Sequence, residues 1–394
     1  MTMSNYCKYG FRAPVFLLLI LAVFPNIPAF GSDVFDPTAT GYKGRKSEIL
    51  YVSKLGNNSD GSSWKKAYHS IQAALSAIPD DKGGHIIIIR PDTYKEANLY
   101  PSYKGAAGSY NVLMGDYDGK AGSGAKGWVV IDSGDPEKGF KSYDFWGTIK
   151  ATLKGWSVEH TDESFSSLIW DRWIFRDLYV SGADAGLFFA ILEEPAPEFS
   201  VIVEDCVSIG RAFGGGVSGH VCRKEEPVVY RRSYLMSLDW WGDAGAALIR
   251  AHHSKACEYY DMIIDDCTLI APDNAVQLGF GFDVYSNLKI KNSRLIVTNF
   301  SQPVGTPSSG IISAGKEGSL HIDFEDCKLM GYKVLGFHKV NDIPQKRNIS
   351  FSVNGKVCAY VQYQQVIPEG MEGLRNWPVD LFNSIGKFRI KEMK

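Results

Sequence analysis

The chain has 394 residues, a net charge of −2 at pH 7 and 22% charged residues. Acidic and basic residues are interspersed, which argues against the basic stripe of a nucleic-acid-binding protein, so we expect no nucleic-acid partner. The 40 glycines and 13% aromatic residues are typical of a turn-rich β protein.

The first 31 residues have the layout of a secretory signal. Lys8 and Arg12 precede an apolar run at 15–24, which is followed by prolines and by Ala29-Phe30-Gly31. The run is about ten residues long, which is short for a membrane span. We predict cleavage after Gly31 and a secreted, periplasmic or cell-surface protein with no membrane span after cleavage. An uncleaved anchor is the alternative.

Residues 47–96 predict a strand, a helix and a second strand, in that order. The strands are expected at 49–52 and 85–89. The helix is expected from 64 to 78, with Ile71, Ala74, Leu75 and Ile78 on its apolar face. We expect this helix to cap one end of the β structure that follows, because uncovered strand edges invite association.

Six later segments repeat one pattern: large apolar residues at the first and third positions, a polar pair, and then a small or apolar residue. The apolar spacing of two predicts strands, and a fixed period of roughly 20–50 residues predicts a solenoid. We therefore expect an all-β parallel β-helix over 32–340, with 341–394 as the C-terminal strands and capping tail of the same domain. The segments end at Leu178, Cys206, Ser233, Cys267, Ser293 and Cys327.

The polar pair recurs once per coil, which favours a role in the turn. We therefore do not nominate Asp265-Asp266 as a metal site, although a calcium-dependent lyase would need such carboxylates. No cofactor is certain, and Ca²⁺ stays open. The pairs are Glu204-Asp205, Arg231-Arg232, Asp265-Asp266, Lys291-Asn292 and Glu325-Asp326.

The register of the repeat argues against most disulfides. Cys206, Cys267 and Cys327 share one repeat position but lie two coils apart, roughly 9.6 Å. That exceeds the Cα limit of roughly 7 Å for a bridge, so we expect buried thiols. Cys222 and Cys257 fall in comparable loops of adjacent coils and are the one plausible pair.

Residues 60–96 contain the elements DGS, W, SIQAAL and GGHIIIIRPDTYKE. With these the chain resembles the pectin-lyase-like superfamily of carbohydrate-active, right-handed parallel β-helices, and the resemblance extends to about residue 340. It implies a single-stranded right-handed β-helix. It does not imply one reaction, because the superfamily includes lyases, hydrolases, esterases, epimerases and adhesins. The chain lacks the catalytic motifs of pectin methylesterases, polygalacturonases and pectate lyases.

A second strand precedes most of the repeated segments, and its outward residues would form a flat surface for a linear polymer. Chemically active side chains are concentrated in the middle coils of this surface. On the strands we expect His220, Arg250, His252 and Gln277, and in the adjoining loops Lys224, Asp239, Trp240, Trp241, Asp243 and His253.

Two reactions fit these residues. β-Elimination of a uronan needs a base for the C5 proton, for which His220, His252 and neutral Lys224 are candidates, and a cation such as Arg250 for the carboxylate. Hydrolysis needs two carboxylates, about 5–5.5 Å apart for retention or about 6.5–9.5 Å apart for inversion, for which Asp239 and Asp243 are candidates.

The remaining candidates would bind substrate, with Trp240 and Trp241 stacking on sugar rings beside Gln277 and His253. We predict a monomeric lyase that cleaves an acidic polysaccharide. A glycoside hydrolase and a non-catalytic carbohydrate-binding protein are the alternatives. Arg250 and His252 could also serve only to bind loop carbonyls, and Asp239 and Asp243 only to form a turn.

Overall fold

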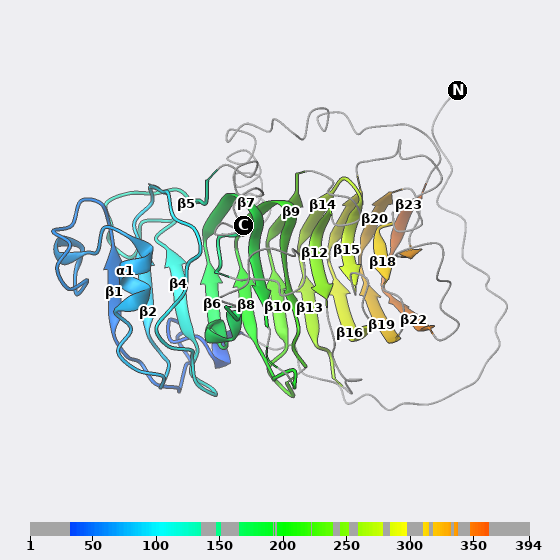
Figure 1. The fold of residues 1–394 in the computed structure, drawn as a ribbon, viewed down its shortest axis with the longest axis horizontal. Coiled ribbons are helices and arrows are strands. Elements are labelled where there is room, and N and C mark those ends of the chain that lie inside the picture. The colour runs from blue at the N-terminus through cyan, green and yellow to red at the C-terminus, as the bar shows by residue number, and fades with distance from the viewer. Residues whose placement is uncertain are drawn as a thin grey trace, which may run out of the picture. The chain divides into compact units, whose positions relative to one another are not determined.

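Parallel strands stacked in register form the body of the protein (Figure 1). The computed structural model describes residues 32–134, 147–150, 165–191, 193, 195–221, 223–238, 245–251, 259–278, 284–297, 310–314, 318–331, 335–337 and 347–361. All of these belong to one unit, Ser32–Lys394. The predicted signal segment lies outside the described residues.

One sheet, sheet A, takes a single strand from each coil. Its strands pair in parallel, and each is the neighbour of the strand one coil earlier and one coil later. In order they are β1 (Ile49–Val52), β2 (Ile86–Ile89), β4 (Asn111–Gly115), β6 (Trp173–Arg176), β8 (Val201–Glu204), β10 (Val228–Arg231), β13 (Met262–Asp265), β16 (Val284–Lys291), β19 (Gly318–Glu325) and β22 (Arg347–Asn354).

The second sheet, sheet B, has two arms that share the long strands β7 (Leu178–Ala190) and β9 (Val207–Ser218). The first arm adds β3 (Thr93–Tyr94), β5 (Val129–Asp132), β11 (Tyr234–Ser237), β14 (Thr268–Ala271), β17 (Arg294–Val297), β20 (Lys328–Gly331) and β23 (Cys358–Val361). The second arm adds β12 (Ala246–Ala251), β15 (Asn274–Leu278), β18 (Ile312–Ala314) and β21 (Leu335–Phe337). The predicted parallel β-helix is confirmed.

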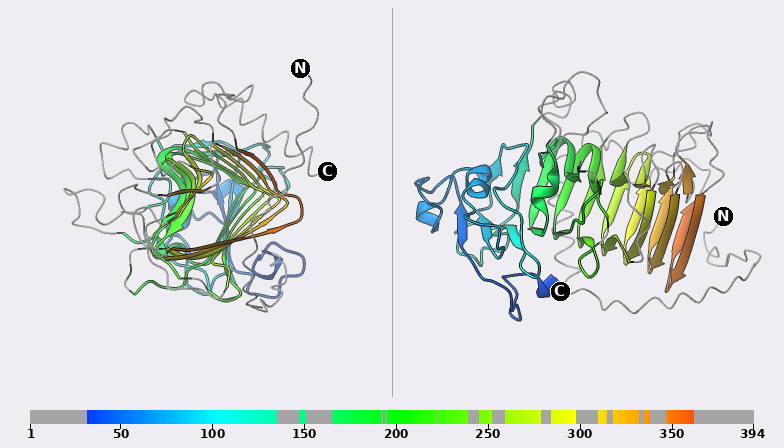
Figure 2. Two further views of the ribbon diagram at one scale, coloured as in Figure 1. Left: turned by 90° about the vertical axis from the view of Figure 1, so that its right-hand side faces the viewer. Right: turned by 60° about the horizontal axis from the view of Figure 1, so that its bottom comes forward.

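The repeated apolar residues pack in one continuous core. The left view of Figure 2 looks along the stack of strands that surrounds this core. Pairs such as Trp173 and Phe175, or Leu288 and Ile290, are at most 1% exposed. Ser208 stands between the apolar Val180 and Leu235 in register, and its hydroxyl joins β9 to β7: it donates to the Gly214 carbonyl at 2.6 Å and accepts from the Leu187 amide at 2.8 Å.

The second residue of each polar pair adopts a left-handed backbone conformation where sheet A passes into sheet B. The φ angles are 54° at Asp205, 46° at Arg232, 50° at Asp266, 52° at Asn292 and 51° at Asp326. Asp and Asn tolerate this conformation better than most residues. The turn role predicted for the polar pairs is confirmed.

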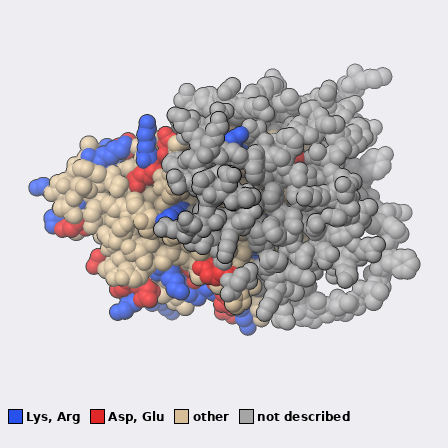
Figure 3. Space-filling view, in the orientation of Figure 1, with Lys and Arg blue, Asp and Glu red and all other residues tan. Residues whose placement is uncertain are grey.

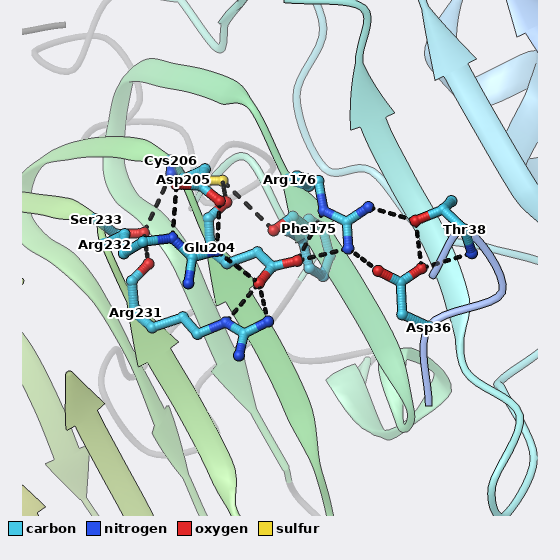
Figure 4. A network of polar contacts seen from close by, with 10 residues as sticks. All are labelled: Asp36, Thr38, Phe175, Arg176, Glu204, Asp205, Cys206, Arg231, Arg232 and Ser233. Carbon is cyan, nitrogen blue, oxygen red and sulfur yellow. Dashed lines mark hydrogen bonds and ion pairs between the residues drawn. The ribbon is translucent and has the colours of Figure 1, made fainter. Parts of the chain in front are cut away.

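The first residue of each pair belongs to an outward row of alternating charge on sheet A. Glu204 is 1% exposed and pairs with Arg176 at 2.7 Å, with Arg231, and with Arg232 at 3.2 Å (Figure 4). Burial alone would raise the pKa of Glu204, but the three arginines outweigh burial and hold that pKa below its ordinary value. In register the row reads Arg176, Glu204, Arg231, Asp265, Lys291 and Glu325.

The N-terminal helix is shorter than predicted. The structure has a 3₁₀ turn at Trp64–Lys66 and then α1 at Ile71–Ser76. Between them Tyr68 pairs with the backbone of β1, which prevents a continuous helix. Ile71, Ala74 and Leu75 pack in the same core as Leu50 of β1, while the role of α1 as a cap stays a prediction. The other described helices are 3₁₀ turns at Ser32–Val34 and Ser167–Trp170.

No helix in the described ranges is long and apolar enough to cross a bilayer. On the face shown in Figure 3, the charged side chains of the described residues are interspersed in sign. Cys206, Cys267 and Cys327 are free and buried, as predicted, and burial raises the pKa of Cys267 to about 12. Cys222 and Cys257, the predicted pair, lie outside the described residues.

Removing the charge of Glu204 should cost far more stability than removing an equivalent charge farther along the same row. We expect Glu204→Gln to lower the free energy of unfolding by about 3 kcal/mol or more, because it removes the buried carboxylate that Arg176, Arg231 and Arg232 share. Glu325→Gln is the matched control: its side chain is 39% exposed, and its loss should cost less than about 1 kcal/mol. Urea unfolding of both variants measures the difference, and equal costs would contradict the role assigned to Glu204.

Candidate functional site

Of the predicted site residues that the structure describes, Gln277 lies on β15, while His220, Lys224 and the side chain of Arg250 lie where the chain passes from the second arm of sheet B back to sheet A. We call this place the return corner; in the central coils it comprises residues 219–221, 223–227, 259–261 and 286–287. Consecutive coils are joined here by backbone hydrogen bonds, from the Val228 amide to the Asp261 carbonyl at 3.1 Å and from the Asp261 amide to the Asn287 carbonyl at 3.0 Å.

Arg250 lies inside the solenoid and not on its surface. In register it stands between Val217 and Leu278, both buried core residues. Its side chain is fully buried: Nε lies 2.9 Å from Asp261 Oδ2, and Nη2 donates to the His220 carbonyl at 2.9 Å. The structure therefore differs from the expectation that Arg250 faces a substrate carboxylate.

Asp261 gives the buried arginine its counter-charge and ties the corner together. Its carboxylate also accepts hydrogen bonds from Ser286 Oγ at 2.8 Å and from the Asn287 amide at 3.0 Å, both on the next coil. A buried charge is tolerated only when it is paired and hydrogen-bonded. In the chain, Arg250 and Asp261 lie before and after the predicted site residues His252 and His253.

His220 is also buried, at 0% exposure, with its ring edge-on to Phe199 at a centroid distance of 6.0 Å. Burial first, and then the cations of Arg250 and Arg223, lower the pKa of His220 well below its ordinary value. The ring is therefore neutral near pH 7. Since it does not reach the surface, His220 is poorly placed to take a proton from a polymer.

Gln277 occupies a different face from Arg250. Its neighbours in register are Ile249 and Ser313, and side chains of successive strand residues point to opposite faces. Gln277 is 1% exposed. The expected single exposed row of His220, Arg250 and Gln277 is therefore not what the structure shows.

Lys224 is the predicted site residue that the structure places in solvent. Its ammonium lies 5.6 Å from the ring centroid of Tyr259, which is on the next coil. The neighbouring Arg223 anchors this turn through two bonds to the Asp171 carboxylate, at 2.9 and 3.0 Å. Lys224 is therefore an exposed cation beside an aromatic ring, on a turn that is anchored by the Arg223–Asp171 ion pair.

Sequence reasoning missed Tyr259 and Asp261. The doublet Tyr259-Tyr260, directly before a repeated segment, is the signal that could have drawn attention to this place. Six predicted site residues lie outside the described residues: Asp239, Trp240, Trp241, Asp243, His252 and His253. Their places in the chain are bounded by strands that are described, since β11 ends at Ser237 and β12 spans Ala246–Ala251.

Within the described ranges, no group of three or more His, Cys, Asp or Glu side chains is placed to hold a metal ion. Asp265, set aside as a metal ligand, pairs with Lys291 at 2.9 Å and accepts from Asn292 at 3.0 Å. These partners suit a structural role for Asp265.

No family model and no curated protein matches the chain. Among solved structures, it is similar to pectate lyase Pel9A, with 13% identity over 82% of this chain and 80% of that one and a TM-score of 0.43. A pectin methylesterase from Aspergillus niger gives 12% identity over 85% and 99% of the two chains, with a TM-score of 0.38. A rhamnogalacturonan lyase gives 10% over 77% and 87%, with 0.29.

The buried and exposed cations of the return corner should respond differently to truncation. We expect Arg250→Ala to lower the free energy of unfolding by about 3–5 kcal/mol, because Asp261 is left buried without its cation. Lys224→Ala, on the neighbouring turn, should change it by less than about 0.5 kcal/mol. Chemical denaturation of both variants gives the comparison. A stable Arg250→Ala protein would show that the pair does not hold the corner.

The buried His220 should make stability depend on pH. Its folded pKa lies below the unfolded value of about 6.5, so its contribution is complete above that pH and is lost as the pH falls toward the folded pKa. The expected slope approaches about 1.4 kcal/mol per pH unit below pH ~6. We expect His220→Gln to flatten the slope between about pH 6.5 and 5. An unchanged slope would assign the dependence to another group.

Proposed function

We propose that the protein binds an acidic polysaccharide at the return corner and cleaves it by β-elimination. The observation that carries the proposal is the exposed Lys224 beside the half-buried ring of Tyr259 on the adjacent coil. A lysine ammonium can neutralise a uronate carboxylate, and an aromatic ring can stack on the apolar face of a sugar.

The anchoring of the corner supports this role. Arg223 and Arg250 are both paired with carboxylates beneath the turns, so the exposed groups are carried on a fixed base. Binding groups need such support, because displacement by about 1 Å can cost a large part of the rate. Because both arginines are paired in this way, neither is free to bind the substrate.

In the proposed reaction Lys224 binds the uronate carboxylate, which makes the C5 proton more acidic. His252, directly after β12, would take this proton, while the C4–O bond breaks and the leaving oxygen acquires a proton. The product carries a C4–C5 double bond at its new non-reducing end. Trp240 and Trp241, which precede β12 in the chain, and His253, which follows it, would extend the sugar-binding surface.

The reaction can be recognised by its product. With a panel of uronans we expect an increase in ultraviolet absorbance from the unsaturated sugar. His252→Ala should lower kcat/KM by about 100-fold or more, in line with the loss of a general base, and Lys224→Ala by at least about 10-fold, through the loss of a charged contact. Lys328→Ala, an exposed lysine on β20, is the matched control and should leave the rate unchanged.

Each other outcome has a defined meaning. New reducing ends without ultraviolet absorbance would replace the lyase with a hydrolase that uses Asp239 and Asp243. Binding without either product would indicate a non-catalytic carbohydrate-binding protein. An unchanged rate of β-elimination in both Lys224→Ala and His252→Ala would show that the active site is not at the return corner.

A further inference from the structure

A serine, a histidine and an aspartate meet on the outer face of sheet A, near its C-terminal end. His321 and Asp323 are on β19, and Ser350 is on β22 directly beside His321 in register. Leu320, Ile322 and Phe324 of β19 point into the core. The alternation of a strand therefore directs His321 and Asp323 outward, and Ser350 with them.

Two hydrogen bonds link the three side chains in series, from Ser350 to His321 to Asp323. Ser350 Oγ lies 2.7 Å from His321 Nδ1, and His321 Nε2 lies 3.1 Å from Asp323 Oδ1. A carboxylate only accepts hydrogen bonds, so Nε2 carries the proton that it shares with Asp323. Nδ1 of the neutral ring is then an acceptor, and it receives the hydroxyl proton of Ser350.

Tyr260 completes the support of the aspartate. Its hydroxyl donates to the second oxygen of Asp323, from two coils earlier in the stack. Both carboxylate oxygens are thus engaged, which fixes the carboxylate against the imidazole. The site remains accessible, because the His321 side chain is 29% exposed and Ser350 lies in solvent.

We propose that Ser350, His321 and Asp323 form a nucleophilic site that hydrolyses carboxylic esters. Both distances fall in the range expected for a nucleophile next to its base and a base next to its orienting group, roughly 2.6–3.2 Å. None of the three residues belongs to the return corner, which contributes only the supporting Tyr260, and the chemistry of the site is independent of uronan cleavage.

The reaction balances with water as the only co-reactant. Ser350 Oγ attacks the ester carbonyl while His321 takes the hydroxyl proton, and the same proton then leaves with the alcohol as the C–O bond breaks. Water, deprotonated by His321, attacks the acyl-serine and releases the carboxylic acid and Ser350. Asp323 is a positioning residue: it keeps the ring in the required tautomer and stabilises the imidazolium.

The test uses the full chain with 4-nitrophenyl acetate and with a fluorophosphonate probe followed by peptide mass spectrometry. We expect a burst of nitrophenolate and a covalent adduct on Ser350. Ser350→Ala should abolish both, and His321→Ala should slow acylation by about 100-fold or more. Asp323→Asn should reduce the burst rate but not its amplitude, a separation that loss of folded protein would not produce.

Ser352→Ala is the matched control. Ser352 is on the same strand and the same face, beside Asp323 in register, but it is not bonded to His321. Its replacement should leave the adduct and the burst unchanged. Far-ultraviolet circular dichroism and unfolding midpoints check that every variant is folded.

Two results would overturn the proposal: no Ser350 adduct under conditions that label a known serine hydrolase, or an adduct formed equally fast in His321→Ala. The outcome is separable from that for the return corner. Ser350→Ala should keep its activity on uronans, and Lys224→Ala should still form the adduct on Ser350.

Discussion

The structure depends on one constraint: parallel strands stacked in register, about 4.8 Å apart. Each position of a coil lies directly beside the same position of its neighbours, so a whole row faces either the core or the solvent. An inward row must be apolar on almost every coil. An outward row of charges must alternate in sign, because like charges side by side repel. The row from Arg176 through Glu204 and Arg231 to Glu325 obeys this rule at every step.

Departures from a row carry a cost that the fold must offset locally. Arg250 stands in an inward row between Val217 and Leu278, and Asp261 offsets its charge. Because Asp261 also binds Ser286 and the Asn287 amide, this compensation joins two coils. Arg223 does the same on the preceding turn through Asp171. These ion pairs and hydrogen bonds therefore connect the loops of successive coils at the return corner.

The sequence allowed the strands, the polar turns and the buried thiols to be predicted, because each leaves a local signal that repeats with the coil. Whether the Arg250 side chain faces the core or the solvent could not be predicted in this way. It depends on how β12 aligns with β9 and β15, and a shift of one residue would exchange the two faces. Ser350 and His321 were missed for a related reason: they are distant in the sequence, and only the pairing of β19 with β22 brings them together. The helix predicted at 64–78 was shortened because Tyr68 bonds to β1, a contact that local propensity does not report.

One short segment connects the polar clusters described above. Tyr259 lies beside Lys224 of the preceding coil, Tyr260 bonds to Asp323 two coils ahead, and Asp261 pairs with Arg250 of its own coil. Three consecutive residues therefore contact an exposed cation, a carboxylate on the outer face and a buried arginine. Because the last of these contacts is the most deeply buried, it sets the position of the segment. The two tyrosines that contact the proposed sites therefore belong to a segment that is anchored by a buried ion pair.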